Sequence, residues 1–308
     1  MSTDDLPQSG IGPLLVPDDD PNRPMHIEWQ TYDRRVLKRW NDLLESNPEE
    51  LEIQEFLELN PAMIPGGSGD IGPGGHHGSE MGAVFRKPRL SGAGREFEPD
   101  FMWVTRSTAL ITPILIEIEK PSKRWFKQDG TPTQDFTHAH DQLNDWRAWF
   151  SRDQNSAIFR DRFLFFDDYS NRRLEPQFVL IYGRKSEFEV GGRHTDPDSL
   201  RRKRDSQRLP DETFMTFDSL RPRHDVSSSI TITMTAQGPK PFAVSPTFCT
   251  GSSVGPYAVK LGPLDEALDR AEMMSADRRE YLADRWMSWR AVEEARMGRS
   301  RFESTGRE

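Results

Sequence analysis

Apolar residues recur at helical spacing near the start of the chain, and they predict a helix there. The residues that form this pattern are Trp29, Val36, Leu37, Trp40, Leu43 and Leu44. A second helix is expected to follow, with Asn47 as N-cap, Pro48 at the first helical position and Glu50 as the acid of a capping box. It should end before Asn60 and Pro61, because the residue before a proline disfavours helical backbone.

Strand-like segments follow in the middle of the chain. Two strands are predicted within 83–106, a third at 111–120, a buried fourth at 177–184 and a short fifth at 213–217. A long helix is expected over 132–151, because residues 131–134 form a capping-box pattern. A Pro-, Gly- and Ser-rich stretch then runs to about 262, and a helical segment broken near Ser275 follows it. This order predicts an α/β fold with one mixed sheet flanked by helices.

The domain organisation follows from these patterns. Residues 1–24 are predicted to be a disordered acidic tail, 25–262 one α/β domain and 263–308 a C-terminal helical segment. The segment 65–82 is rich in glycine, but neither a preceding strand nor a following helix is visible, so we interpret it as a connector and not as a nucleotide-binding loop. His76 and His77 within it are expected to be a solvated pair.

Charge is distributed unevenly along the chain. The formal net charge is −9, and the acidic excess lies in residues 1–60, whereas the remainder is balanced. The segment 184–208 is basic and contains the run Arg201, Arg202, Lys203 and Arg204. Such a run is more often a solvated loop than a phosphate-binding surface. It is still the best candidate in the sequence for contacts with a nucleic-acid backbone.

The single cysteine, Cys249, rules out an internal disulfide and a cysteine-based zinc site. A reducing cytoplasm is the expected compartment. No apolar run approaches the roughly 20 residues that a membrane helix needs, so no membrane partner is expected.

The strand at 111–120 carries the candidate chemistry. Strand periodicity places Leu115, Glu117 and Glu119 on one face, with the two carboxylates roughly 6.6 Å apart along the strand. Asp100, on the preceding strand, can face Glu117 across a hairpin. Three carboxylates at a sheet edge suit Mg²⁺, which activates water and stabilises negative charge on a phosphate.

The alternative interpretation is that Glu117 and Glu119 line the solvated face of an antiparallel strand. The apolar Leu115 on the same face argues against it. On the long helix, Gln142 is positioned to orient a water or bind a phosphate, and simple surface polarity is an equally good interpretation. His138 on the same helix is expected to face solvent.

An ordered series of short segments resembles a known family. The residues PD at 99–100, EIEKP at 117–121 and HAHDQLNDW at 138–146 resemble the nuclease domain of the Shedu anti-phage defence family. Segments 53–66, 178–184, 214–220 and 278–289 are also similar to it, so the resemblance covers roughly residues 28–290. Because so few residues precede it, no separate N-terminal sensor domain is expected.

The resemblance implies that 25–262 is a PD-(D/E)xK endonuclease domain that depends on Mg²⁺, with Mn²⁺ as a substitute, and that cuts DNA. It also implies a homo-oligomer. By motif position, Asp100 and Glu117 are metal ligands and Gln142 assists. An acid of the leading helix, Glu52 or Glu55, is a further candidate ligand.

This sequence departs from the family pattern at the lysine. Glu119 occupies the usual lysine position and Lys120 follows one place later, so both are candidate catalytic residues, with Glu119 also a candidate metal ligand. Strand pleating favours Glu119, because Lys120 points to the opposite face unless the strand is bulged. The alternative function is a catalytically inactive DNA-binding or scaffold protein. An RNA-directed nuclease has no RNA-recognition signature to support it.

Overall fold

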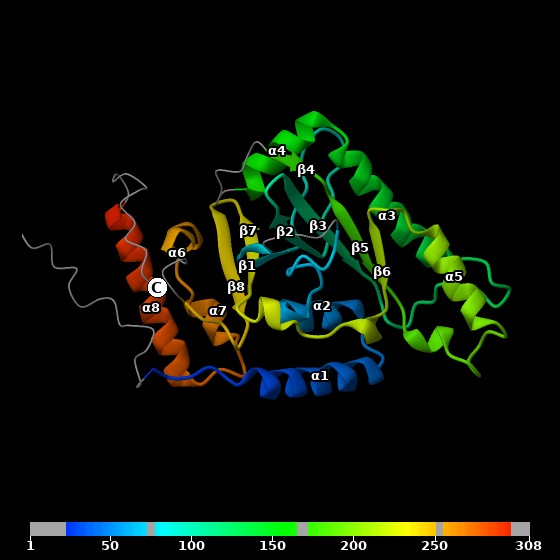
Figure 1. Cartoon of the computed structure of the whole chain (residues 1–308), viewed down its shortest axis with the longest axis horizontal. Coiled ribbons are helices and arrows are strands. Elements are labelled where there is room, and N and C mark those ends of the chain that lie inside the picture. Colours follow the sequence, from blue (N-terminus) through cyan, green and yellow to red (C-terminus); the bar gives the residue numbers. More distant parts are fainter. Residues whose placement is uncertain (1–22, 73–77, 165–171, 251–254, 297–308) are drawn as a thin grey trace, which may run out of the picture.

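One mixed β-sheet organises the protein (Figure 1). The computed structural model describes residues 23–72, 78–164, 172–250 and 255–296, so most of the predicted tail, His76 and His77, and residues 297–308 lie outside the described residues. The helices and strands, in chain order, are α1 (Trp29–Glu45), α2 (Glu50–Leu59), β1 (Ser79–Arg86), β2 (Phe101–Arg106), β3 (Leu110–Ile118), α3 (Gln134–Phe150), α4 (Asp153–Phe163), β4 (Arg173–Leu174), β5 (Gln177–Ile181), α5 (Pro197–Gln207), β6 (Glu212–Met215), β7 (Ile230–Thr235), β8 (Gly238–Val244), α6 (Gly255–Leu261), α7 (Asp265–Asp269) and α8 (Ala276–Arg296).

The strands follow the order β6-β5-β3-β2-β1-β7-β8, and β4 pairs with the start of β3. The pairs β1/β2, β2/β3 and β7/β8 are antiparallel, whereas β3/β5, β5/β6 and β1/β7 are parallel. The predicted α/β fold with a mixed sheet flanked by helices is therefore confirmed.

Each face of the sheet packs against its own set of helices. Helices α1 and α2 cover the face that carries Trp103, Ile114 and Ile116. Helices α3 and α4, together with α6, α7 and α8, share a core with the opposite face, which carries Met102 and Leu115. The predicted alternation along β3 is correct, because Ile114, Ile116 and Ile118 lie in one core and Leu115 lies in the other.

The start of α2 differs from the prediction. Its N-cap is Glu49, which forms a capping box with Glu52. Asn47 instead has a backbone φ of 55° in the turn between α1 and α2. An N-cap residue needs non-helical, typically extended, backbone, and a left-handed asparagine cannot supply it, so the helix begins two residues later.

Two regions predicted as irregular hold regular structure. The stretch before 262 contains β7, β8 and α6, and β8 includes Pro239 and Pro241. These prolines are compatible with a strand because β8 lies at the edge of the sheet, where one row of amides needs no partner. The basic run lies on helix α5, which Asp196 caps by accepting a hydrogen bond from the Ser199 amide.

The C-terminal helices pack against the chain's own core. Apolar residues of this segment join the same core as Met102 of β2 and Leu115 of β3; they are Leu264, Leu268, Ala271, Met274, Leu282 and Trp289. Trp286 is also fully buried, and its indole Nε1 donates to the Gly262 carbonyl at 2.7 Å. Within the described ranges, no helix combines the length and apolar character that crossing a membrane requires.

Candidate active site

Asp100 and Glu117 meet at one end of the β2/β3 hairpin. The antiparallel register pairs Phe101 with Ile116, so one step further Asp100 lies opposite Glu117. The Ile118 amide donates a 2.9 Å hydrogen bond to Asp100 Oδ2 and fixes the carboxylate against β3. The structure therefore brings together the two acids that the sequence pattern paired.

Glu119 continues the same edge. Its amide donates to the Ile181 carbonyl at 3.1 Å, so the extended pairing with β5 persists beyond the end of β3 without a bulge. Asp100, Glu117 and Glu119 are 9%, 8% and 6% exposed. The Glu119 carboxylate forms an ion pair with Lys123. Three nearly buried acids thus lie at the carboxyl end of β3.

The protonation equilibria of these acids are strongly perturbed. Burial raises the pKa of Asp100 to about 7, while the hydrogen bond from Ile118 and the charge of Lys87 act in the opposite direction. Burial also raises the pKa of Glu117 well above its usual value, and the charges of Asp100, Glu119 and Glu50 add to this effect. Buried carboxylates that repel one another hold protons or attract cations.

The acid that α2 contributes is Glu50, and neither Glu52 nor Glu55. Glu50 is half-buried at the first position of α2, and burial and the charge of Glu119 raise its pKa. Glu52 accepts a 2.8 Å hydrogen bond from the Glu49 amide in the capping box. Glu55 is exposed and is not among the charges that act on Asp100 or Glu117. The structure therefore places Glu50, and not Glu52 or Glu55, beside the strand acids.

Lys120 turns away from the three strand acids. It forms an ion pair with Glu49, and the hydrogen bond to Glu49 raises the pKa of Lys120. This placement is the one that strand pleating predicts for the residue after Glu119.

Gln142 reaches the site from α3. It is half-buried, and its side chain hydrogen-bonds to Glu117, which partly offsets the rise in the pKa of that carboxyl. His138, on the same helix, is exposed. A contact with Glu117 favours a role at the site for Gln142 over simple surface polarity.

The neighbouring His140 belongs to a separate polar group. Its Nε2 lies 3.0 Å from Glu212 Oε2, and its ring stacks on Phe136. Arg147 binds both Glu212 and Asp211. Because these acids already have cationic partners, the group secures α3 to the start of β6.

Lys87 is a residue that sequence reasoning missed. It follows β1 with a left-handed backbone, φ 43°, and its amide donates to the Asp100 carbonyl at 2.8 Å. Burial raises the pKa of both Asp100 and Glu50, and the charge of Lys87 partly opposes that rise. Non-glycine residues rarely adopt this conformation, and such strain is concentrated at functional sites. No sequence signal marks Lys87, because its proximity arises only when β1 pairs with β2.

A basic pocket of about 330 Å³ adjoins the acids. Its cationic lining residues are Lys123, Arg124, Arg184 and Arg193. Lys123 connects the pocket to the acids through its ion pair with Glu119. The pocket lies beyond the carboxyl ends of the parallel strands β3 and β5, the edge where open α/β sheets bind ligands.

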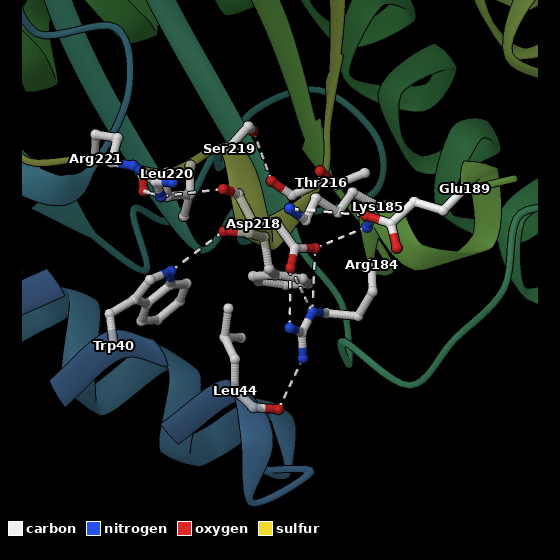
Figure 2. A network of polar contacts seen from close by, with 11 residues as sticks. Trp40, Leu44, Arg184, Lys185, Glu189, Thr216, Asp218, Ser219, Leu220 and Arg221 are labelled. Carbon is white, nitrogen blue, oxygen red and sulfur yellow. Dashed lines mark hydrogen bonds and ion pairs between the residues drawn. The ribbon is translucent and has the colours of Figure 1, made fainter. Parts of the chain in front are cut away.

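Figure 2 shows how Arg184 is held at this edge. Its guanidinium binds Asp218 at 2.9 to 3.1 Å and donates to the Leu44 carbonyl at 2.8 Å. Burial alone would raise the pKa of Asp218, but the hydrogen bonds from Arg184 and the Lys185 amide lower it overall. Trp40 Nε1 also donates to the Phe217 carbonyl. This network ties α1 to the segments after β5 and β6.

The chemistry of the available donor atoms suits a hard divalent cation. In the part of the chain that the structure describes, no three His, Cys, Asp or Glu side chains are already gathered as a metal site. The available donors are carboxylate oxygens, which Mg²⁺ prefers, and burial and mutual repulsion raise the pKa values of Asp100 and Glu117, an effect that a bound cation would oppose. Asp100 and Glu117 are the residues that would hold such a cation.

The fold and the site together define a mixed α/β protein with a carboxylate cluster at the carboxyl end of a central strand. The chain belongs to the Shedu family, because the family model for the Shedu protein SduA, C-terminal, matches residues 46–221, more than half of its length. The matched region contains Glu50, Asp100, Glu117, Glu119 and Gln142. No curated protein and no solved structure matches the chain significantly.

Proposed function

We propose that this protein is a Mg²⁺-dependent DNA endonuclease of the PD-(D/E)xK type that acts in anti-phage defence. One observation carries the proposal: Asp100 and Glu117 are nearly buried, adjacent and strongly perturbed in pKa. Carboxylates placed for structure alone are normally paired with cations, whereas perturbed clusters at strand ends are typical of functional sites. Membership of the Shedu family supports the defence role.

Each residue has a distinct role in the proposed reaction. Asp100 and Glu117 hold the metal, with Glu50 or Glu119 as a further ligand, and Gln142 orients the water or phosphate beside Glu117. Bound Mg²⁺ would supply an activated water and neutralise charge on the scissile phosphate. Glu119, in the position usual for lysine, accepts the proton of the attacking water, and Lys123 holds its carboxylate in place.

The basic pocket supports DNA as the substrate. Arg124 and Arg193 line it, are exposed and have no carboxylate partner among the described residues. We infer that Arg124 and Arg193 bind phosphates of the DNA backbone and that Lys123 lies nearest the phosphate that reacts. The run on α5 is a weaker candidate, because Arg201 binds Asp198 and Arg204 stacks on Trp125 and Phe188.

We further propose a homo-oligomer in the cytoplasm. The oligomer is suggested by the family resemblance, and the compartment by the single cysteine. Light scattering coupled to size exclusion would measure the mass, and a monomer at micromolar concentration would contradict the oligomer.

A second candidate function is a DNA-binding or scaffold protein without catalysis. Glu119 in place of lysine, already paired with Lys123, is the observation that favours it. Such a protein would bind DNA equally well with and without Mg²⁺.

The test is an incubation of the purified full chain with supercoiled, linear and single-stranded DNA. We expect cleavage with Mg²⁺ or Mn²⁺ and none in excess EDTA. Cleavage that persists in EDTA would refute metal dependence. Metal-independent DNA binding with no cleavage of any substrate would establish the second candidate.

A further inference from the structure

A larger pocket lies away from the carboxylates, outside the matched region 46–221. Its volume is about 520 Å³, and it is formed by residues just before α1, residues near 249 and the first turns of α8. Figure 1 shows the chain that leads into α1 passing the start of α8. A volume of this size falls in the range of small-molecule sites.

Arg278 is the main feature of this pocket. It is 4% exposed and donates to the Pro24 carbonyl at 2.9 Å and the Phe248 carbonyl at 3.0 Å. Its Nη2 also lies 3.6 Å from Cys249 Sγ, and its Nε is buried without a hydrogen-bond partner. Two of these partners are neutral backbone carbonyls, and no carboxylate of the described chain acts on the guanidinium. A buried cation without a counter-ion is costly, so the site is incomplete as it stands.

The other residues that line the pocket also favour an anion. None of the described residues that line the pocket is acidic, whereas Arg23 and His26 both border it. Burial lowers the pKa of Arg278, and the charge of Arg23 acts in the same direction. The pocket therefore has positive potential and one orphaned buried donor.

We propose that this pocket binds a small phosphate monoester, with a nucleoside monophosphate as the best-matched class. The phosphate supplies the counter-charge that Arg278 lacks. A lone phosphate would leave most of the 520 Å³ unfilled, and Tyr281, which also lines the pocket, offers aromatic surface beside Arg278 for the remainder of the ligand. This site is independent of the carboxylates and of the nuclease proposal.

Cys249 makes the proposal directly measurable. It is the only cysteine of the chain, it is exposed, and its sulfur contacts Arg278. A ligand seated on Arg278 therefore covers the one thiol that can be alkylated.

The experiment measures the alkylation rate of Cys249 in the full-length protein by neutral iodoacetamide at constant ionic strength. The additions are AMP, inorganic phosphate, adenosine or chloride, with glutathione as the control thiol. We expect saturable protection by AMP of at least tenfold, weaker protection by phosphate, and none by adenosine or chloride. Equal rates in AMP and chloride would overturn the proposal, as would equal protection by AMP and adenosine.

Two variants separate ligand binding from folding. Arg278→Met removes the cation that the proposed phosphate pairs with, but also two carbonyl contacts that hold the fold together. His26→Glu keeps those contacts and places a carboxylate in the pocket, and we expect it to weaken AMP protection at least tenfold without lowering the melting temperature. His138→Glu, the same change on exposed α3, is the matched control and should bind AMP as the wild type does. A His26→Glu protein that binds AMP with unchanged affinity would overturn the assignment.

Discussion

The Ile118 amide donates a 2.9 Å hydrogen bond to Asp100 Oδ2, which joins the acid before β2 to the strand that carries Glu117. The bond holds one oxygen of Asp100, and under the proposed function the other would bind the metal. It also explains why burial is tolerated at this position, since a backbone amide partly compensates the charged form. An asparagine can accept the same bond, so the charge of Asp100 can be removed without removing its anchor.

This relationship predicts that Asp100→Asn stabilises the metal-free protein at high pH. The pKa of Asp100 is about 7 in the folded protein against an ordinary value of 3.8. The folded state therefore keeps a proton that the unfolded state releases, so this contribution to stability is complete below about pH 4 and is lost as pH rises to about 7. At pH 8 the variant should be more stable by about 1 to 3 kcal/mol, because it no longer buries this charge.

Urea unfolding of both proteins in EDTA at pH 5, 6.5 and 8 measures this difference. Asp100→Asn should flatten the pH dependence and should also abolish cleavage. A variant less stable than the wild type at pH 8 would show that Asp100 is a structural acid.

Glu119→Gln and Lys120→Ala should differ sharply in activity. Glu119 lies among the buried acids, whereas Lys120 pairs with Glu49 at the start of α2. We expect Glu119→Gln to slow cleavage by about two orders of magnitude, the scale of a lost acid–base group. Lys120→Ala should cost far less. Rates of plasmid nicking at equal enzyme concentration give the ranking, and an inactive Lys120→Ala beside an active Glu119→Gln would reverse the assignment.

Two variants of Lys87 separate the effect of its charge on cleavage from the effect of its backbone strain on stability. Both Lys87→Ala and Lys87→Gly remove the cation beside Asp100, so both should reduce cleavage by about tenfold or more, the lower end of a lost charge interaction at an active site. Only glycine relieves the φ of 43°, so Lys87→Gly should be more stable than Lys87→Ala by about 1 kcal/mol. Thermal unfolding and nicking rates together test this. Full activity in either variant would remove Lys87 from the site.

The C-terminal helices should be essential to the fold. Trp286 is fully buried in the core that α8 shares with the sheet. Trp286→Ala should lower the free energy of unfolding by about 3 to 5 kcal/mol, the range for a large buried aromatic. Met287→Ala, an exposed neighbour on α8, is the matched control and should change stability little. A truncation after Gly262 with an unchanged melting temperature would contradict this packing.

The site could be predicted from the sequence where local periodicity determined it. Alternation along β3 separated Ile116 from Glu117, and the hairpin brought Asp100 to Glu117, as expected. Pleating alone also predicted the divergence of Glu119 and Lys120. These relations depend only on neighbours along one or two strands.

The features that the sequence did not predict depend on tertiary placement. Glu50 lies near the acids because α2 begins at Glu50 with Glu49 as its N-cap, and this is not visible in the capping pattern around Asn47. Strand β8 was not predicted, because it contains prolines, which are acceptable in a strand only at the edge of a sheet. The helix that carries the basic run was not predicted, because contacts such as that of Lys203 with the Gly130 carbonyl join residues distant in sequence.

The most direct measurement is the nicking of supercoiled plasmid in Mg²⁺ by the wild type and by Glu117→Gln, with circular dichroism to verify that both are folded. Glu117 is the acid whose pKa burial and its three acidic neighbours raise most clearly. We predict rapid nicking by the wild type, none above background by Glu117→Gln, and unchanged helical signal in both. A folded Glu117→Gln that nicks plasmid at the wild-type rate would contradict the assignment of these carboxylates to metal-dependent DNA cleavage.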